Sequence, residues 1–170
     1  RLGHDFSTYK TNTITRRISR RMGLNQIESY EKYVRYLREN PDEVESLFRE
    51  LLIGVTSFFR DSASFDVLKS ESIPELFDQI PDDGTFRAWV PGCSTGEEVY
   101  SLAIVLHEVL DTASKRIHLQ IFGTDIDRYA IEKAREGLFP ANIAADVSAE
   151  RLDRFFSKEG DHFRIRKEIR

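Results

Sequence analysis

Apolar residues in the first 52 positions recur every three or four residues, the spacing of one face of an α-helix. One stripe ends at Gly23, where glycine suits a left-handed helix end. Another starts at Asn40, with Pro41 in the first turn and Glu43 in the place of a capping box partner. A third stripe, with apolar residues at helical spacing after Ser29, lies between these two. The pattern therefore predicts three short helices, and we place this helical domain at residues 1–60.

Ser62 and Pro74 then begin two short connecting helices, and beyond them the spacing changes. Phe86–Val90 is a compact apolar run and Ile117–Ile121 alternates apolar with polar residues, so both are predicted strands. Helical patterns follow each strand, at about 97–110 and at 126–136, and Gly137 ends the second of them. This order predicts a βαβ unit with a parallel sheet, and therefore an α/β fold in residues 61–170.

The last segment carries weaker patterns. Ser148 is positioned to cap a helix that holds Leu152, Phe155 and Phe156, and Phe163–Arg166 alternates like one arm of an antiparallel pair. Two strands are too few for a doubly wound sheet, so we expect the α/β domain to be truncated at its C-terminus.

The net charge of −4 is unevenly distributed. Residues 1–40 hold nine Lys and Arg against four Asp and Glu, a balance of +5 that leaves −9 for the rest. The basic end suits an acidic partner, but the acidic remainder and the lack of aromatic residues among the arginines argue against nucleic acid. At helical spacing Arg16 and Arg20 form one cationic row and Arg17 and Arg21 a second. The four arginines are either a docking surface for carboxylates or a solvated face.

Other features restrict the class of protein. The longest apolar runs are far shorter than the roughly 20 residues that cross a bilayer, and no signal pattern opens the chain, so we expect a cytoplasmic protein without membrane insertion. The single cysteine, Cys93, excludes an internal disulfide, and the four histidines lack metal-ligand spacing, so no metal is expected. Cys93 has no histidine nearby in sequence to activate it, and a small side chain suits its turn.

The segment between the first strand and its helix is rich in small residues, including Gly92 and Gly96. Its spacing matches neither a dinucleotide fingerprint nor a phosphate loop, so it is a tight turn or a site for a ligand without pyrophosphate. Asp125 at the tip of the second strand can accept both hydroxyls of a ribose. Glu97 can accept from an ammonium group or can simply oppose the helix dipole.

A second segment, Gly54–Asp61, places adjacent aromatic residues between hydroxyl and charged residues. Phe58 and Phe59 are interpreted as core anchors. Arg60 requires a carboxylate partner, either in the neighbourhood of Asp61 or at the methionine end of S-adenosylmethionine, and Thr56 can donate to that cofactor group.

These residues resemble a known family, the chemotaxis receptor methyltransferases or CheR family. The matching motifs are Val55-Thr56-Ser57-Phe58-Phe59-Arg60, Cys93-Ser94-Thr95-Gly96-Glu97-Glu98-Val99-Tyr100-Ser101, and Thr124-Asp125-Ile126-Asp127 followed by Ala134-Arg135-Glu136-Gly137. The resemblance implies a helical N-terminal domain, a Rossmann-like S-adenosylmethionine-dependent domain, and transfer of a methyl group to receptor glutamates as γ-glutamyl methyl esters. It implies that Thr56 and Arg60 hold the methionine carboxylate, Glu97 the amino group and Asp125 the ribose, with Gly92 in the cofactor turn. No catalytic residue is assigned.

The arginine-bearing helix around Arg16 to Arg21 resembles the receptor-facing helix of the family, which implies the cytoplasmic helices of chemoreceptors as partners. Residues 155–170 resemble the start of the inserted antiparallel subdomain, but their loop at Ser157–His162 is short, so tethering to a receptor pentapeptide is not expected. Gly54 stands where the family usually has Asn. This departure favours the alternative function, a non-catalytic cofactor-binding or docking module within a hybrid signalling protein, and Pro91-Gly92-Cys93 resembles methyltransferase modules of such regulators.

Overall fold

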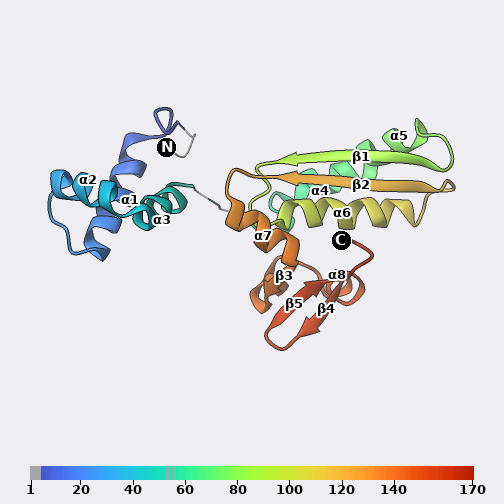
Figure 1. The fold of residues 1–170 in the computed structure, drawn as a ribbon. Helices are drawn as coiled ribbons and strands as arrows, with labels where there is room; N and C mark the ends of the chain where they lie inside the picture. The colour runs from blue at the N-terminus through green and yellow to red at the C-terminus, as the bar shows by residue number, and fades with distance from the viewer. Residues whose placement is uncertain (1–4, 53, 55) are drawn as a thin grey trace. The chain divides into compact units, whose positions relative to one another are not determined.

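The computed structural model describes residues 5–52, 54 and 56–170, and it divides the chain into two compact units, one ending before Gly54 and the other starting there (Figure 1). The second unit begins earlier than the boundary expected at residue 60. Thr56 and Arg60 therefore lie in the same unit as the parallel sheet.

The first unit contains the three predicted helices, α1 (Thr11–Leu24), α2 (Tyr30–Glu39) and α3 (Pro41–Leu51). The prediction that Gly23 ends the first helix is wrong, because Gly23 lies inside α1 and the left-handed residue is Gln26, at φ +57°. The helix continues past Gly23 because the backbone N–H of Asn25 still donates to the carbonyl of Arg21.

Asn40 also acts differently from the prediction. Its side chain does not cap α3; instead, Nδ2 donates to the carbonyl of Tyr36 at 2.9 Å and closes the end of α2. Because α2 and α3 meet at this residue, its one side-chain amide bonds to the end of α2 and not to the start of α3. Glu43 does not complete a capping box either, since its carboxylate is buried among the helices.

The second unit begins with a helical connection made of α4 (Ser62–Val67), a π-helical turn η1 (Leu68–Ser72) and α5 (Ile73–Asp78). The N-cap residue of α4 is Asp61 rather than Ser62, and Asp61 accepts a hydrogen bond from the Ser64 hydroxyl at 2.7 Å. The two predicted connecting helices are thus consecutive segments of one helical stretch.

The βαβ prediction is confirmed: β1 (Gly84–Pro91), α6 (Glu97–Leu110), β2 (Ile117–Thr124) and α7 (Arg128–Glu136) follow in order, and β1 pairs with β2 in parallel. The register runs from Gly84 opposite Ile117 to Pro91 opposite Thr124, so the carboxyl ends of both strands lie together. Gly137 ends α7 at φ +58°, as predicted.

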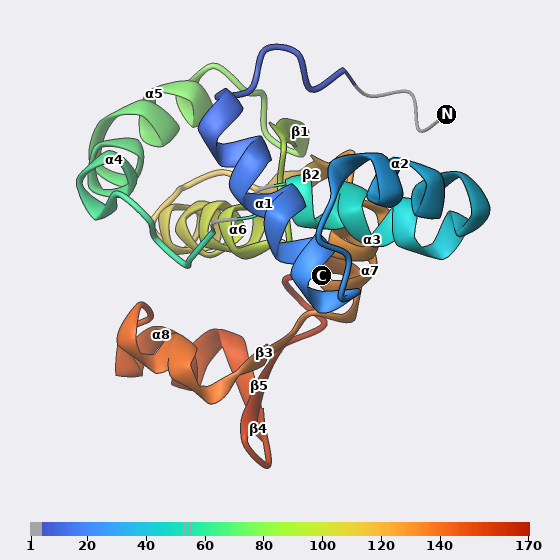
Figure 2. The same cartoon turned by 90° about the vertical axis from the view of Figure 1, so that its left-hand side faces the viewer.

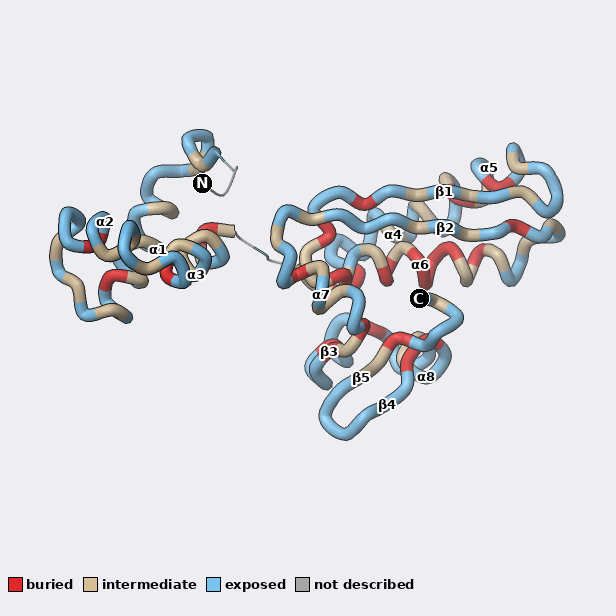
Figure 3. The backbone as a smooth tube through the Cα atoms, in the orientation of Figure 1, coloured by how far each residue is buried: buried red, intermediate tan, exposed pale blue. Residues whose placement is uncertain are grey.

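The core of the second unit centres on α6, where Figure 3 shows the buried positions concentrated. Ile104, Val105 and Leu106 are fully buried there. On the opposite face of the sheet, Trp89 and Phe122 lie directly across from each other and are 67% and 53% exposed. Among the described residues, no helix combines the length and the apolar composition that a membrane span requires.

The tail forms a small antiparallel sheet that Figure 2 shows as a separate ribbon from β1 and β2. Its strands lie in the order β3-β5-β4. Their bounds are Leu138–Pro140 for β3, Phe156–Glu159 for β4 and His162–Ile165 for β5, with the 3₁₀ turn η2 (Ala141–Ala145) and α8 (Ala149–Phe155) between β3 and β4. The helix capped by Ser148 is confirmed, but Phe156 belongs to β4 rather than to that helix.

Candidate functional site

The turn between β1 and α6 has a backbone that favours glycine at two positions. Gly92 has φ +69°, and among the described residues nothing beyond its chain neighbours lies within 4 Å of the place where a Cβ would stand. Gly96 has φ +97°, and a Cβ there would lie 2.9 Å from the Cβ of Ala134 on α7. Gly92 therefore leaves open space at the strand end, while Gly96 allows two helices to approach closely.

Asp125 holds this turn against the tip of β2. One carboxylate oxygen accepts the N–H of Ser94 at 2.8 Å and the other accepts the N–H of Asp127, also at 2.8 Å. Asp125 is half-buried. Because each carboxylate oxygen has two lone pairs, both oxygens keep the capacity to accept a ribose hydroxyl.

Glu97 lies on the other side of the same turn, as the first residue of α6. Its Oε2 accepts the Thr95 hydroxyl at 2.6 Å, which orients the carboxylate. Ser94 and Thr95 are consecutive, so Asp125 and Glu97 are hydrogen-bonded to neighbouring residues of one turn. The structure therefore brings together Gly92, Glu97 and Asp125.

Cys93 lies beneath this turn, 2% exposed. Burial, and secondly the negative charge of Asp125, raise the pKa of the Cys93 thiol. A neutral, buried thiol is a poor nucleophile, so the structure favours the packing role for Cys93. Gly123 opposite confirms the tight packing, because a Cβ there would lie 3.0 Å from the Cys93 sulfur.

The segment that carries Thr56 and Arg60 passes close to the same turn at Gly54 and is hydrogen-bonded to α6 at Phe59. A Cβ on Gly54 would lie 2.9 Å from the Ser94 hydroxyl, and the N–H of Phe59 donates to the Ser101 hydroxyl on α6 at 2.9 Å. Thr56 is half-buried between these two points, and Arg60 is exposed directly after the second. Val55, part of the first motif, lies outside the described residues.

Phe58 and Phe59 are both core residues, 2% and 7% exposed. Phe58 packs edge-to-face on Phe139 of β3 and Phe156 of β4, with ring centroids 4.8 and 5.5 Å apart. These contacts join the segment to the antiparallel sheet. Within the part of the chain that the structure describes, a Cβ at residue 54 would meet only the Ser94 hydroxyl, which can turn away, so this contact does not explain glycine where the family has Asn.

The basic helix α1 has acidic partners that the local sequence does not reveal. Arg21 forms a two-point ion pair with Glu43 on α3, its Nε at 3.0 Å from Oε1, and the Tyr33 hydroxyl of α2 donates to the same carboxylate at 2.7 Å. Arg17 and Arg20 both contact Glu50, with Arg20 at 2.8 Å from the carboxylate. The sequence does hold a signal for an acidic face opposite α1, because Glu43 and Glu50 are seven residues apart and hence share a face of α3.

The four arginines therefore differ in exposure. The side chains of Arg17 and Arg21 are 23% and 20% exposed, whereas Arg20, although it also pairs with α3, is 67% exposed and Arg16 is exposed too. Arg16 and Arg20 lie one turn apart on a single row. That row carries the two most exposed of the four arginines.

Charge and burial shift the titration of the buried cluster. The hydrogen bonds from Arg21 are the largest cause that holds the pKa of Glu43 below its usual range. Burial, followed by the hydrogen bond to Glu43, raises the pKa of Tyr33. The cluster is therefore a carboxylate held between a cation and a neutral phenol.

A turn of small residues between a parallel strand and its helix, with one acid at the helix start and another at the next strand tip, is typical of α/β proteins that bind a ribose-containing ligand. Models of two domains match the chain: the all-alpha domain of CheR methyltransferases at residues 1–52 and their SAM binding domain at residues 54–170. The chain belongs to the CheR methyltransferase family. The resemblance seen in the three motifs is confirmed, as are the fold class and S-adenosylmethionine as cofactor.

The relatives differ in size. An uncharacterized 104.1 kDa protein of Rhodobacter capsulatus is 43% identical over 166 residues, which cover 98% of this chain and 17% of that protein. Chemotaxis protein methyltransferases of Salmonella typhimurium and Borreliella burgdorferi are each 29% identical, over 99% and 81% of this chain and 58% and 50% of their own lengths. The chain thus spans little more than half of these chemotaxis relatives, and a small part of the larger protein.

The described residues fit S-adenosylmethionine. The cofactor carries a ribose diol, an ammonium, a carboxylate and a sulfonium, and the turn offers two acids beside the open space at Gly92. Arg60 lies one residue beyond the Phe59–Ser101 hydrogen bond, and its pairing with the carboxylate end stays a prediction.

Proposed function

We propose that this chain is the receptor-facing and cofactor-binding part of a methyltransferase that esterifies glutamate side chains on cytoplasmic helices of chemoreceptors or a related signalling protein. The observation that carries the proposal is the turn at residues 92–96 with Glu97 and Asp125 on its two sides, within a domain that matches the SAM binding domain of the family. The names of the chemotaxis relatives support the acceptor.

In this proposal Asp125 accepts the ribose hydroxyls, Glu97 accepts from the ammonium, and Arg60 with Thr56 binds the methionine carboxylate. S-adenosylmethionine supplies a methyl group on a sulfonium, which is a good leaving group. An acceptor glutamate is already ionised at neutral pH, so the protein has to align it and exclude water rather than supply a general base.

The helical unit, which we assign to receptor docking, presents Arg16 and Arg20 to the acceptor protein. Arg17 and Arg21 hold the helix in place through their bonds to α3. Salt screens the attraction between exposed charges and an acidic partner, so this row mainly affects the rate of association and the orientation of the bound partner.

We also propose that the protein acts in the cytoplasm without a pentapeptide tether. Strands β4 and β5 are joined by Gly160 and Asp161 alone, with Gly160 at φ +59°. This two-residue turn leaves less peptide surface than the longer glycine-containing loop of tethering members. Receptors with and without a C-terminal pentapeptide should therefore be methylated equally well.

The test uses the full-length protein with methyl-labelled S-adenosylmethionine and receptor membranes. The expected result is base-labile methyl on receptor glutamates. In the Arg16→Ala/Arg20→Ala variant, the apparent KM for receptor should rise and its salt dependence should flatten, while cofactor affinity stays the same.

Arg49→Ala is the matched control, because Arg49 is an exposed arginine of the same unit on a different helix, 3.8 Å from Glu45. It should leave the receptor kinetics unchanged. Absence of labelled receptor despite intact cofactor binding would overturn the enzymatic function. Unchanged kinetics of the double variant at low and high salt would remove the row from the proposal.

A further inference from the structure

Ser101 is a fully buried polar residue on the second turn of α6, with 0% exposure. Its hydroxyl donates to the carbonyl of Glu97 at 2.7 Å and accepts the N–H of Phe59 at 2.9 Å. The first bond is an ordinary bond from serine to the preceding helical turn. The second joins residues 42 positions apart, so this hydroxyl links two separate segments of the chain.

The partner of Ser101 has an unusual backbone. Phe59 has φ +48°, and Asp61, two residues on, has φ +66°. Residues other than glycine hold the left-handed conformation only where surrounding contacts maintain it. The hydroxyl of Ser101 satisfies the buried N–H of Phe59 in this conformation and thereby sets the direction in which the chain continues into Arg60.

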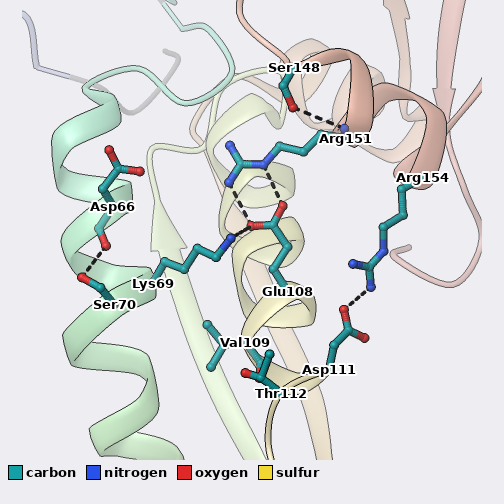
Figure 4. Close-up of polar contacts among 10 residues, drawn as sticks. All are labelled: Asp66, Lys69, Ser70, Glu108, Val109, Asp111, Thr112, Ser148, Arg151 and Arg154. Carbon is teal, nitrogen blue, oxygen red and sulfur yellow. Dashed lines mark hydrogen bonds and ion pairs between the residues drawn. The ribbon is translucent and has the colours of Figure 1, made fainter.

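The ring of Phe59 is held independently of its amide. The guanidinium carbon of Arg151 lies 4.1 Å from the ring centroid, and the same guanidinium forms a fork with Glu108 at 2.7 and 2.9 Å. Figure 4 shows the Glu108 carboxylate between Arg151 of α8 and Lys69 of η1, which lies 2.9 Å away. Loss of the Ser101 hydroxyl should therefore free the backbone of the segment while the ring stays packed.

We infer that Ser101 is a positioning residue for the amino-acid end of the cofactor, because its one hydroxyl joins the backbone beside Arg60 to the backbone of Glu97. The inference rests on the proposed function, in which Arg60 binds the carboxylate and Glu97 the ammonium of that end. These two groups share one carbon in the cofactor. The spacing of the protein's cation and acid must therefore be fixed, and the Ser101 hydroxyl is bonded to both segments.

The test compares two nucleosides on the full-length protein. S-adenosylhomocysteine carries the amino-acid end, whereas 5′-methylthioadenosine has the same adenine, ribose and sulfur without it. Calorimetry should show that Ser101→Ala weakens S-adenosylhomocysteine binding about tenfold, the size of one weakened charged hydrogen bond. Binding of 5′-methylthioadenosine should change less than about twofold, and Ser101→Thr, which keeps a hydroxyl, should retain more affinity than Ser101→Ala.

Thr112→Ala is the matched control, since the Thr112 hydroxyl donates to the Val109 carbonyl at 2.9 Å just beyond the other end of α6. It should affect neither nucleoside. Equal weakening of both nucleosides by Ser101→Ala would mean general loosening of the domain and would overturn the inference. A wild-type protein that binds neither nucleoside would instead overturn the proposed cofactor site, and the role of Ser101 with it.

Discussion

Replacing Glu43 by Gln should destabilise the helical unit selectively. The change keeps the shape of the side chain but removes the charge that pairs with Arg21 and accepts from Tyr33. Removing one member of a buried ion pair costs about 3–5 kcal/mol, because the remaining charge is left uncompensated. The Arg21 side chain is 20% exposed, so water reduces the expected cost to about 2–3 kcal/mol.

Hydrogen exchange measured by mass spectrometry on the 170-residue chain can locate this loss. Peptides within α1, α2 and α3 should exchange about 30- to 140-fold faster, since 1.4 kcal/mol corresponds to a factor of ten. Trp89, the single tryptophan, lies in β1 and reports on the other unit. Its fluorescence transition in urea should not move.

Two further variants separate the charge effect from packing. Glu45→Gln removes an exposed carboxylate 3.8 Å from Arg49 and should leave exchange unchanged. The triple variant Arg21→Met/Tyr33→Phe/Glu43→Leu leaves no uncompensated charge and should recover most of the lost protection. The reasoning is refuted if Glu43→Gln behaves like Glu45→Gln, or if the triple variant exchanges as fast as Glu43→Gln.

Three other predictions concern pH, the cofactor site and the turn. Because the folded pKa of Glu43 is depressed, its contribution to the free energy of unfolding is present above the unfolded pKa of about 4.3 and is lost as pH falls through the folded pKa. Helicity in an acid titration should therefore fall below about pH 4.3, and Glu43→Gln should lack this loss. Asp125→Ala and Arg60→Ala should each weaken S-adenosylhomocysteine binding to a protein with the complete domain by about 1.5–3 kcal/mol in calorimetry, and wild-type affinity in both would refute the placement of the site. Gly96→Ala should cost about 1–3 kcal/mol in urea unfolding followed by Trp89 fluorescence, given φ +97° and the contact with Ala134, and an unchanged midpoint would contradict it.

The elements that the sequence predicts well are those whose signals are local. The strand at β1, the helix α6, and the caps at Gly137 and Ser148 depend on residues within a few positions of one another. Strand β3 was missed because three residues are too few to show alternation, and Phe156 was assigned to a helix because its pairing with Ile165 is a tertiary contact. Gly23 is a local signal that misled, because α1 continues through it and a suitable cap residue does not by itself end a helix.

The candidate site divides in the same way. Glu97 and Asp125 could be selected because a helix start and a strand tip are recognisable in sequence, and their roles with the cofactor stay predictions. The acidic partners of the basic helix could not be assigned, because the pairs of Arg21 with Glu43 and of Arg20 with Glu50 span 22 and 30 positions. The role of Ser101 depends on a contact with Phe59 that no spacing rule contains.

The two backbone bonds to Asp125 have a consequence for the thermodynamics of ligand capture. Because Asp125 already holds the amides of Ser94 and Asp127, the wall that we propose for the ribose site is assembled before any nucleoside arrives. A preorganised wall does not have to lose conformational freedom on association, so more of the contact energy is retained as affinity. Product and substrate share the adenosine that meets this wall. The rigid wall should therefore hold both with similar strength, and discrimination between them falls to the groups around the sulfur.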